Sequence, residues 1–251
     1  MVNRPPPKIF SAARLAAIRA RALALQQRED AARFVFDEMV EDILERLAFM
    51  RVEPRRALVL GDMTGLLSEA LTHGGAQLSA LPAGRFDPQQ PWPEGGFDFI
   101  ASLCHLDTIN DLPGALIHMR SALNEGGLAI ASFPGAGSLP RLRSAMLAAD
   151  GDRPAARMHP MVDTRAAAEL MQRAGFTRQV VDICPLNVSY RSLERLVQDL
   201  RGQSLSKALA SPTPPLTKAG LERARASFME GADSDGRVTE RFELLTLTGW
   251  R

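Results

Sequence analysis

A glycine-rich turn after a short apolar run is the first feature of the sequence that points to chemistry. Residues 57–60 are apolar, and Gly61, Asp62, Thr64 and Gly65 follow them before a helical pattern begins. Glycine permits a sharp turn there, and open α/β sheets bind ligands at the carboxyl ends of their strands. The spacing therefore predicts a ligand site at this turn, with a purely structural turn as the alternative.

Cys104 and His105 form a second candidate pair, directly after the apolar run 97–103. An imidazole can serve as a general base and a thiol as a nucleophile. The alternatives are a hydrogen-bonded structural histidine and a packed thiol. No histidine has neighbours at metal-ligand spacing and no phosphate-binding loop is present, so neither a metal nor a nucleotide phosphate is expected.

The elements that position these residues are those of a soluble α/β protein. The 251 residues are 45% apolar and 24% charged, which is close to the globular average and enough for one large domain or two small ones. Thirty basic and 29 acidic side chains give a net charge of +1. Without a protein-wide field or an interleaved basic and aromatic tract, nucleic acid is not an expected partner.

Charge is nevertheless uneven near the beginning of the chain. Residues 1–33 carry seven basic groups and two acids, whereas the next twenty residues carry six acids and two bases. This pattern suits two helices with opposite charged faces, and we expect the basic face to be solvated rather than to form a partner site. Two cysteines, no membrane span and no secretory signal predict a cytoplasmic protein.

From residue 54 onward, short apolar runs alternate with helical stretches, which indicates a sheet of mainly parallel strands. The predicted strands are 57–60, 77–81, 97–103, 128–133, 176–184 and 238–248, the last of them antiparallel. The predicted helices are 9–28, a second ending before Pro54, 64–72, 112–123, 138–149, 164–174, 189–209 with a break near Gly202, and 217–229.

The stretch 82–96 does not fit this alternation, because seven of its fifteen residues are proline or glycine. A further helix and strand with their connections would need roughly 25 residues. We therefore predict that no further helix and strand form here, that the second strand forms the edge of the sheet, and that 82–96 folds over this edge. Trp92 is the expected apolar plug.

Several segments together resemble the class I S-adenosylmethionine-dependent methyltransferases. Gly61, Thr64 and Gly65 match the first motif of that family, and segments 97–100, 110–116 and 123–128 resemble its later strands and helix. Segments 171–176, 235–238 and 247–250, with the N-terminal residues 9–10, 19–22 and 45–47, are similar to one branch. That branch holds the malonyl-carrier methyltransferases and the methyltransferase-fold assembly factors of respiratory complex I.

The resemblance implies a Rossmann-like sheet of about six strands with helices on both faces and S-adenosylmethionine as the cofactor. It also implies an N-terminal helical segment, 1–53, that packs on an α/β domain, 54–251, with a helical insertion at about 189–230. The implied cofactor-binding positions are Gly61, Asp62, Thr64, Gly65, Leu81, Pro82, Leu103, Cys104 and His105. No catalytic residue is assigned.

Compared with the family's usual sheet, the third strand is missing, so 82–96 is expected to fold over the sheet edge or over a vacant adenine site. Three further positions depart from the family pattern. Pro82 stands where the family places an acid that accepts hydrogen bonds from the cofactor ribose, Val59 replaces an acid before the turn, and Met63 replaces a glycine. Each lost charge-assisted hydrogen bond weakens binding by about 1.5–3 kcal/mol. We therefore expect weak or absent cofactor binding.

Two functions are consistent with the sequence. The first is methyl transfer from S-adenosylmethionine to a small acid or a protein. The second is a non-catalytic methyltransferase fold that binds a protein partner, for example in the assembly of respiratory complex I. The sequence names neither the acceptor nor the oligomeric state.

Overall fold

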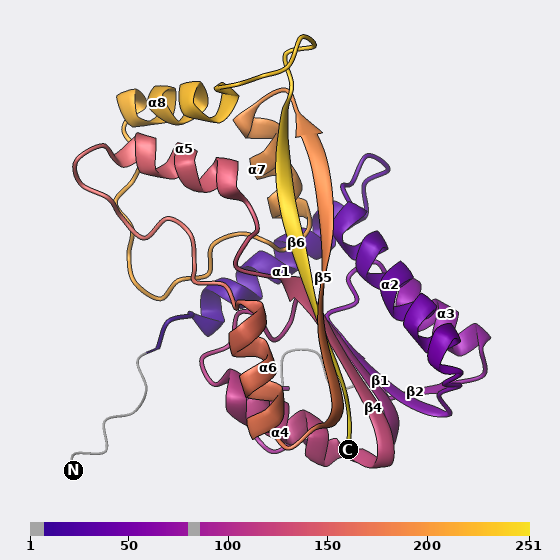
Figure 1. Ribbon diagram of the computed structural model, residues 1–251. Helices are drawn as coiled ribbons and strands as arrows, with labels where there is room; N and C mark the ends of the chain where they lie inside the picture. The colour runs from indigo at the N-terminus through magenta and orange to yellow at the C-terminus, as the bar shows by residue number, and fades with distance from the viewer. Residues whose placement is uncertain (1–7, 80–85) are drawn as a thin grey trace, which may run out of the picture.

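The computed structural model describes residues 8–79 and 86–251 (Figure 1). The helices are α1 (Ala12–Gln26), α2 (Phe34–Met50), α3 (Leu66–His73), α4 (Leu112–Ala122), α5 (Pro140–Asp150), α6 (Thr164–Arg173), α7 (Leu193–Gly202) and α8 (Lys218–Met229). The strands are β1 (Arg56–Leu60), β2 (Gln77–Ser79), β3 (Phe97–Leu103), β4 (Leu123–Pro134), β5 (Thr177–Tyr190) and β6 (Val238–Trp250).

The described strands form one mixed sheet of six strands in the order β2-β1-β3-β4-β6-β5. Strands β2, β1, β3 and β4 pair in parallel, whereas β6 runs antiparallel between β4 and β5. Strand β2 lies at the edge and has three residues, a short edge of the kind that limits pairing with another chain. The predicted Rossmann-like class, the six strands and the antiparallel last strand are confirmed.

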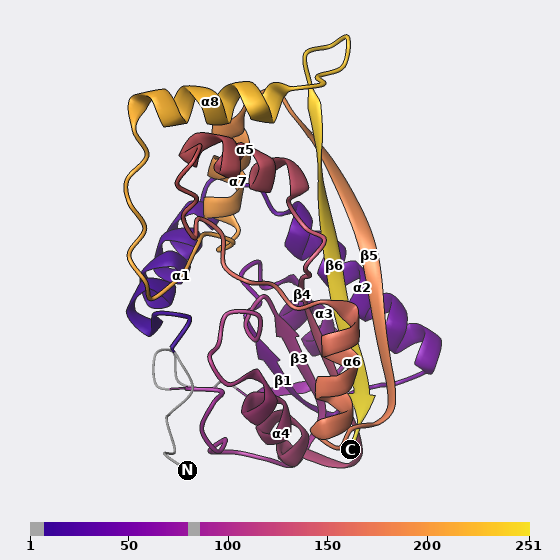
Figure 2. The same cartoon turned by 60° about the vertical axis from the view of Figure 1, so that its left-hand side comes forward.

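Helices cover both faces of the sheet because its strands alternate between two apolar sides. Helices α2 and α3 lie on one side, and α4 and α6 lie on the other (Figures 1 and 2). In β1, Ala57 belongs to the first buried cluster, with α2 and α3, while Leu58 and Leu60 belong to the second, with α4 and α6. This two-residue period is what a strand buried on both faces requires.

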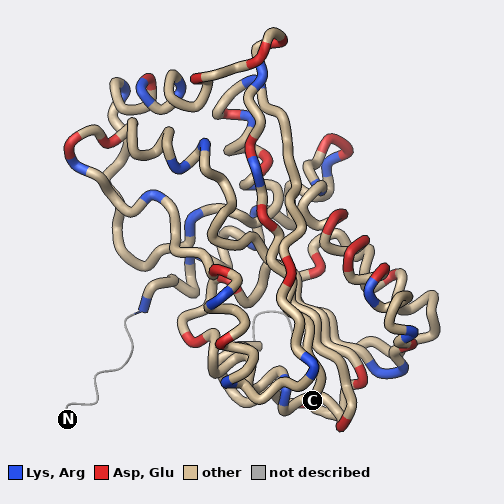
Figure 3. The backbone as a smooth tube through the Cα atoms, viewed as in Figure 1, with Lys and Arg blue, Asp and Glu red and all other residues tan. Residues whose placement is uncertain are grey.

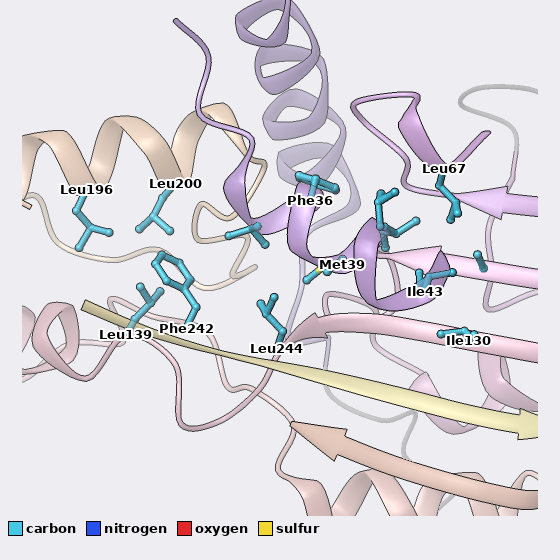
Figure 4. Close-up of a cluster of buried hydrophobic side chains, with 14 of the residues drawn as sticks. Phe36, Met39, Ile43, Leu67, Ile130, Leu139, Leu196, Leu200, Phe242 and Leu244 are labelled. Carbon is cyan, nitrogen blue, oxygen red and sulfur yellow. The ribbon is translucent and has the colours of Figure 1, made fainter. Parts of the chain in front are cut away.

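The first cluster extends beyond the sheet. Phe36 of α2, Ile130 of β4 and Phe242 of β6 are fully buried in it, together with Leu139 and Leu200 (Figure 4). One continuous core therefore joins the sheet to the layer formed by α5, α7 and α8.

The end of β5 and the helix that follows it both differ from the prediction. The predicted strand 176–184 continues to Tyr190, because β5 pairs with β6 as far as Tyr190 and Val238. The predicted helix 189–209 is therefore only Leu193–Gly202, which begins after the Ser192 cap. Residues 203–209 are irregular, and Leu209 forms an isolated bridge with Phe10 instead.

Residues 86–96 contain neither a helix nor a strand, as predicted for the described part of the stretch 82–96. Phe86 and Trp92 contact each other edge to face, with ring centroids 5.2 Å apart, and both pack against the second buried cluster. Trp92 therefore covers the sheet face that carries α4. Coverage of the β2 edge remains a prediction, since residues 80–85 lie outside the described part.

Acidic side chains follow α2 along the surface, as Figure 3 shows in red. The expected acidic helix is therefore present, and its inner side supplies buried residues such as Phe36 and Ile43. Helix α1 meets α7, and α2 packs against α3 and β4. The division into segments 1–53 and 54–251 stays a prediction.

Candidate functional site

The glycine-rich turn opens onto a pocket of about 310 Å³ at the carboxyl ends of β1 and β3. We call this the turn pocket; it is lined by Arg19, Leu23, Phe36, Val59, Gly61, Asp62, Met63, Ser68, Cys104, His105 and Ser204. The lining comes from α1, α2, the β1–α3 turn, the end of β3 and the segment after α7. The predicted ligand position at a parallel sheet's carboxyl edge thus coincides with a real cavity.

Gly61 is required by its surroundings. Its φ is +79°, and a Cβ built on it would lie 2.0 Å from the carbonyl oxygen of Leu103. The turn after β1 therefore crosses the end of β3 at a distance that no other residue allows. Gly65, with φ +77°, has open space around it and ends the turn as the N-cap of α3.

Asp62 is held by its own chain. One carboxylate oxygen accepts the backbone N–H of Gly65 at 2.9 Å and the hydroxyl of Thr64 at 3.2 Å. The other accepts both the backbone N–H and the hydroxyl of Ser68 at 2.8 Å. Asp62 therefore occupies the N–H groups at the start of α3, where helix ends ordinarily bind an anion.

Cys104 lies in a tight, left-handed position at the end of β3, with φ +46°. Its Sγ lies 3.8 Å from the Sδ of Met39. Burial, and then the nearby Asp107 charge, raise the pKa of this thiol well above its usual range. A thiol held in its protonated form is a poor nucleophile.

His105 faces the same pocket, next to the ring of Phe86, which is stacked at a centroid distance of 6.5 Å. Burial, and then the Arg19 charge, lower the pKa of His105 to about 3. The imidazole is neutral at pH 7, and its basicity is too low for efficient general base catalysis. Its buried Nε2 has no hydrogen-bond partner among the described residues.

Arg19 lines this site and the buried Asp107 lies near it, although the sequence analysis assigned a role to neither. Arg19 projects from α1 into the turn pocket, and its Nη2 donates to the carbonyl of His105 at 3.5 Å. The expectation of a fully solvated basic face on the first helix is therefore wrong for Arg19. Burial raises the pKa of Asp107 to about 6, although the Arg19 charge opposes this rise.

The structure brings together Gly61, Asp62, Cys104 and His105 of the expected cofactor positions. Thr64, Gly65 and Leu103 stand directly behind the lining, through the contacts with Asp62 and Gly61 given above. Leu81 and Pro82 lie outside the described residues. The sequence of α1 carries arginines at several positions, and nothing in their spacing distinguishes Arg19 from the others. Only the packing of α1 shows that Arg19 lines the turn pocket.

Within residues 8–79 and 86–251, no group of three histidine, cysteine or acidic side chains could hold a metal ion. None of the described helices is long and apolar enough to cross a membrane.

Comparison with known proteins gives relatives of two kinds. A zebrafish (Danio rerio) protein, the mitochondrial arginine-hydroxylase NDUFAF5, is 29% identical over 165 residues, which is 64% of this chain and 51% of that protein. The chain thus spans about half the length of this relative. A malonyl-[acyl-carrier protein] O-methyltransferase from Halorhodospira halophila is 28% identical over 253 residues, covering 90% of this chain and 84% of the relative.

Comparison with solved structures also gives methyltransferases, and the first of the two matches below supports the fold. A candidate methyltransferase from Bacillus halodurans matches with a TM-score of 0.50 and 10% identity, over 78% of this chain and 91% of that one. A Haemonchus contortus phosphoethanolamine N-methyltransferase with bound S-adenosylhomocysteine matches with a TM-score of 0.49 and 13% identity, over 99% of this chain and 62% of that one.

The sequence model of the methyltransferase domain matches residues 31–181, which run from α2 into β5 and include the whole turn pocket apart from α1 and the segment after α7. Because this match covers more than half of the chain and the sheet has the corresponding architecture, the protein belongs to the methyltransferase-domain family, with a class I, Rossmann-like fold.

Proposed function

We propose that this protein is a methyltransferase-fold binding factor that holds S-adenosylmethionine, the cofactor of its family, weakly or not at all. The observation that carries the proposal is the set of four hydrogen bonds that Asp62 receives from Thr64, Gly65 and Ser68. These donors are the ones that an anionic part of a ligand would use at the start of α3. The chain's own carboxylate already satisfies them.

Charge supports the same conclusion. S-adenosylmethionine carries a positive sulfonium, and the guanidinium of Arg19 lines the pocket. Like charges in a partly buried pocket repel each other more strongly than in water. At the sequence level, Pro82 offers no acceptor for the ribose hydroxyls, so the residues present fit the cofactor poorly.

The role that remains is binding. The fold's buried clusters fill both faces of the sheet, whereas the contacts of Asp62 and the charge of Arg19 disfavour the cofactor. A complete scaffold that holds the family's usual ligand weakly suits a protein that acts through its surface. The resemblance to complex I assembly factors, and the NDUFAF5 relative, make a respiratory-complex subunit the proposed partner class.

Calorimetric titration tests the cofactor part of this proposal. We expect S-adenosylmethionine to give no saturation up to millimolar concentration. S-adenosylhomocysteine, which lacks the sulfonium charge, should bind at least as well. Arg19→Gln should reduce the difference in affinity between S-adenosylmethionine and S-adenosylhomocysteine. Arg21→Gln, on the same helix, is the control and should leave this difference unchanged. Micromolar affinity of the unmodified protein for S-adenosylmethionine would overturn the proposal.

Co-purification from the native cell tests the binding part. A stoichiometric protein partner without methyl transfer or arginine hydroxylation on that partner is the expected result. Radiolabelled methyl on a cell extract, or a hydroxylated arginine formed on the partner only when this protein is present, would contradict a non-catalytic role.

Methyl transfer to a small acid or to a carrier-bound acid is the second candidate. The observations that favour it are the intact geometry at Gly61 and Gly65 and the match with the malonyl-carrier enzyme over 90% of the chain. A sulfonium is already an activated methyl donor, so such a reaction needs alignment more than acid-base help. A methylated carboxylate after incubation with S-adenosylmethionine would establish it.

A further inference from the structure

A second and larger pocket, of about 500 Å³, lies away from the glycine-rich turn. It is lined by α5, α7, α8 and irregular segments near them. These three helices are in the upper part of Figures 1 and 2. We call it the cap pocket. Its volume is within the range of small-molecule sites, which is roughly 300–1,000 Å³.

The wall of the cap pocket is largely aliphatic. Its apolar members are Leu139, Leu142, Met146, Met158, Met161, Leu193, Val197, Leu200, Leu205, Leu216 and Leu221. Three of these are methionines, whose unbranched side chains adapt to flexible apolar ligands. A straight hydrocarbon chain matches such a wall better than a rigid or polar ligand does.

The charged groups of the cap pocket are mostly cationic: Arg157, Arg201, Lys207 and Arg225, with Glu194 as the one acid. Arg157 is neutralised by Asp150, at 2.5 Å. Arg225 is paired with Glu194, also at 2.5 Å. These two arginines therefore have little charge to offer a ligand.

In the described part of the chain, no carboxylate lies within 4 Å of the charged nitrogens of Arg201 or Lys207. Arg201 is exposed to water, whereas Lys207 is half-buried at the pocket wall. Its ammonium donates only to the hydroxyl of Thr213. Burial, and then the charges of Arg14 and Arg157, lower the pKa of Lys207. An ammonium that lies among other cations beside an apolar cavity, without a carboxylate partner, is available to pair with an anion.

From this juxtaposition we propose that the cap pocket binds a single-chain amphiphilic anion, with its aliphatic chain among the methionines and leucines and its anionic head on Lys207. The ligand class is that of a medium-chain fatty carboxylate or alkyl phosphate. The site is separate from the turn pocket, so it does not depend on whether S-adenosylmethionine binds.

Calorimetric titration of the full chain with decanoate and decyl phosphate tests the ligand class. We expect saturable one-to-one binding of both anions, below the concentration at which they form micelles. Decyltrimethylammonium, with the same chain and the opposite charge, should bind at least about tenfold more weakly, and acetate should not bind. Equal binding of the anionic and cationic amphiphiles would overturn the proposal.

Two matched pairs of variants locate the site. Lys207→Met keeps the aliphatic stem and should weaken decanoate binding about tenfold or more, whereas Lys218→Met, at the exposed start of α8, should leave it unchanged. Val197→Trp, which fills the cavity, should abolish binding, whereas Leu147→Trp should not, because Leu147 is 56% exposed and outside the lining.

Thermal melting of each variant shows whether it is folded. Decanoate binding that survives both Lys207→Met and Val197→Trp in folded protein would place the ligand elsewhere and refute the inference. The titrations with S-adenosylmethionine are separate measurements, so failure of either proposal is recognised independently of the other.

Discussion

Asp62 of the turn pocket and Lys207 of the cap pocket differ in whether the chain's own groups satisfy their charge. In the turn pocket, the carboxylate of Asp62 is satisfied by four hydrogen bonds from its own chain. In the cap pocket, the ammonium of Lys207 finds a hydroxyl but no carboxylate. A polar group that its own fold satisfies leaves little free energy for a ligand, whereas an unsatisfied one favours a complementary ligand.

The two pockets also differ in how they are built. The turn pocket lies where backbone segments of β1 and β3 almost touch, and Gly61 is needed for that approach. The cap pocket lies between helices. The two pockets are close to each other along the chain, because Ser204 lines the turn pocket and the next residue, Leu205, lines the cap pocket. Substitutions should therefore be tolerated better in the cap pocket than in the turn pocket.

The strongest test of this difference is Gly61→Ala. The new methyl group would meet the Leu103 carbonyl and would require a left-handed alanine, so we expect a loss of about 4 kcal/mol in the free energy of unfolding. Gly65→Ala, with the same backbone strain but open space, should lose about 1 kcal/mol. Urea denaturation measures both, and equal losses would show that the close approach is not what constrains the turn.

Glu240→Gln examines the support of the cap pocket. The buried carboxylate accepts backbone N–H groups of Arg141 at 3.2 Å and Leu142 at 2.8 Å, at the start of α5. An amide would present a donor to one of them, so we expect a loss of about 3 kcal/mol and weaker decanoate binding. The exposed Glu125→Gln is the control. An unaltered melting temperature for Glu240→Gln would contradict this account.

Asp107→Asn examines the buried charge beside the turn pocket. Burial raises the pKa of Asp107 to about 6 in the folded protein, above its usual 3.8, so the folded state holds the proton more tightly. The resulting stability is fully present below pH 3.8 and is lost as the pH rises through 6. The variant should therefore be more stable than the unmodified protein at pH 7.5, by about 3 kcal/mol, and nearly equal to it near pH 4.

Denaturation curves of the two proteins across this pH range provide the measurement. A difference that does not change between pH 4 and pH 7.5 would show that Asp107 does not titrate in this window. A larger difference at pH 4 would reverse the sign of the argument.

The smallest expected change in stability comes from Asp62→Ala. Loss of a capping carboxylate at the start of α3 should cost about 1 kcal/mol. It also releases the N–H groups of Gly65 and Ser68, so binding of S-adenosylhomocysteine should become tighter. Asp111→Ala, which removes the corresponding cap of α4, should cost a similar amount without changing the affinity. Unchanged affinity in Asp62→Ala would remove the main support for the proposed function.

Local patterns in the sequence determined most of the fold. The alternation of apolar runs and helical stretches, with Pro and Gly concentrated in 82–96, determined a six-stranded sheet in which the second strand is the edge. These features depend on backbone preferences and on chain length, which neighbouring residues decide. The glycines of the turn after β1 likewise identified the place of the cavity, because strand ends and glycine turns are local features.

Only the tertiary structure decided what each polar group contacts. From its sequence position, Asp62 could bind a ligand or cap the helix that follows it. In the structure Ser68 donates two hydrogen bonds to its carboxylate, so Asp62 caps α3. Arg19 belongs to a helix whose basic residues look solvated, and packing of α1 on the rest of the chain turns this one inward. The cap pocket combines α5, α7 and α8, which are up to about eighty residues apart in sequence, so no local pattern contains it. Hydrogen bonds and charge pairs between distant segments depend on distances of a few ångströms, and those distances exist only once the chain has folded.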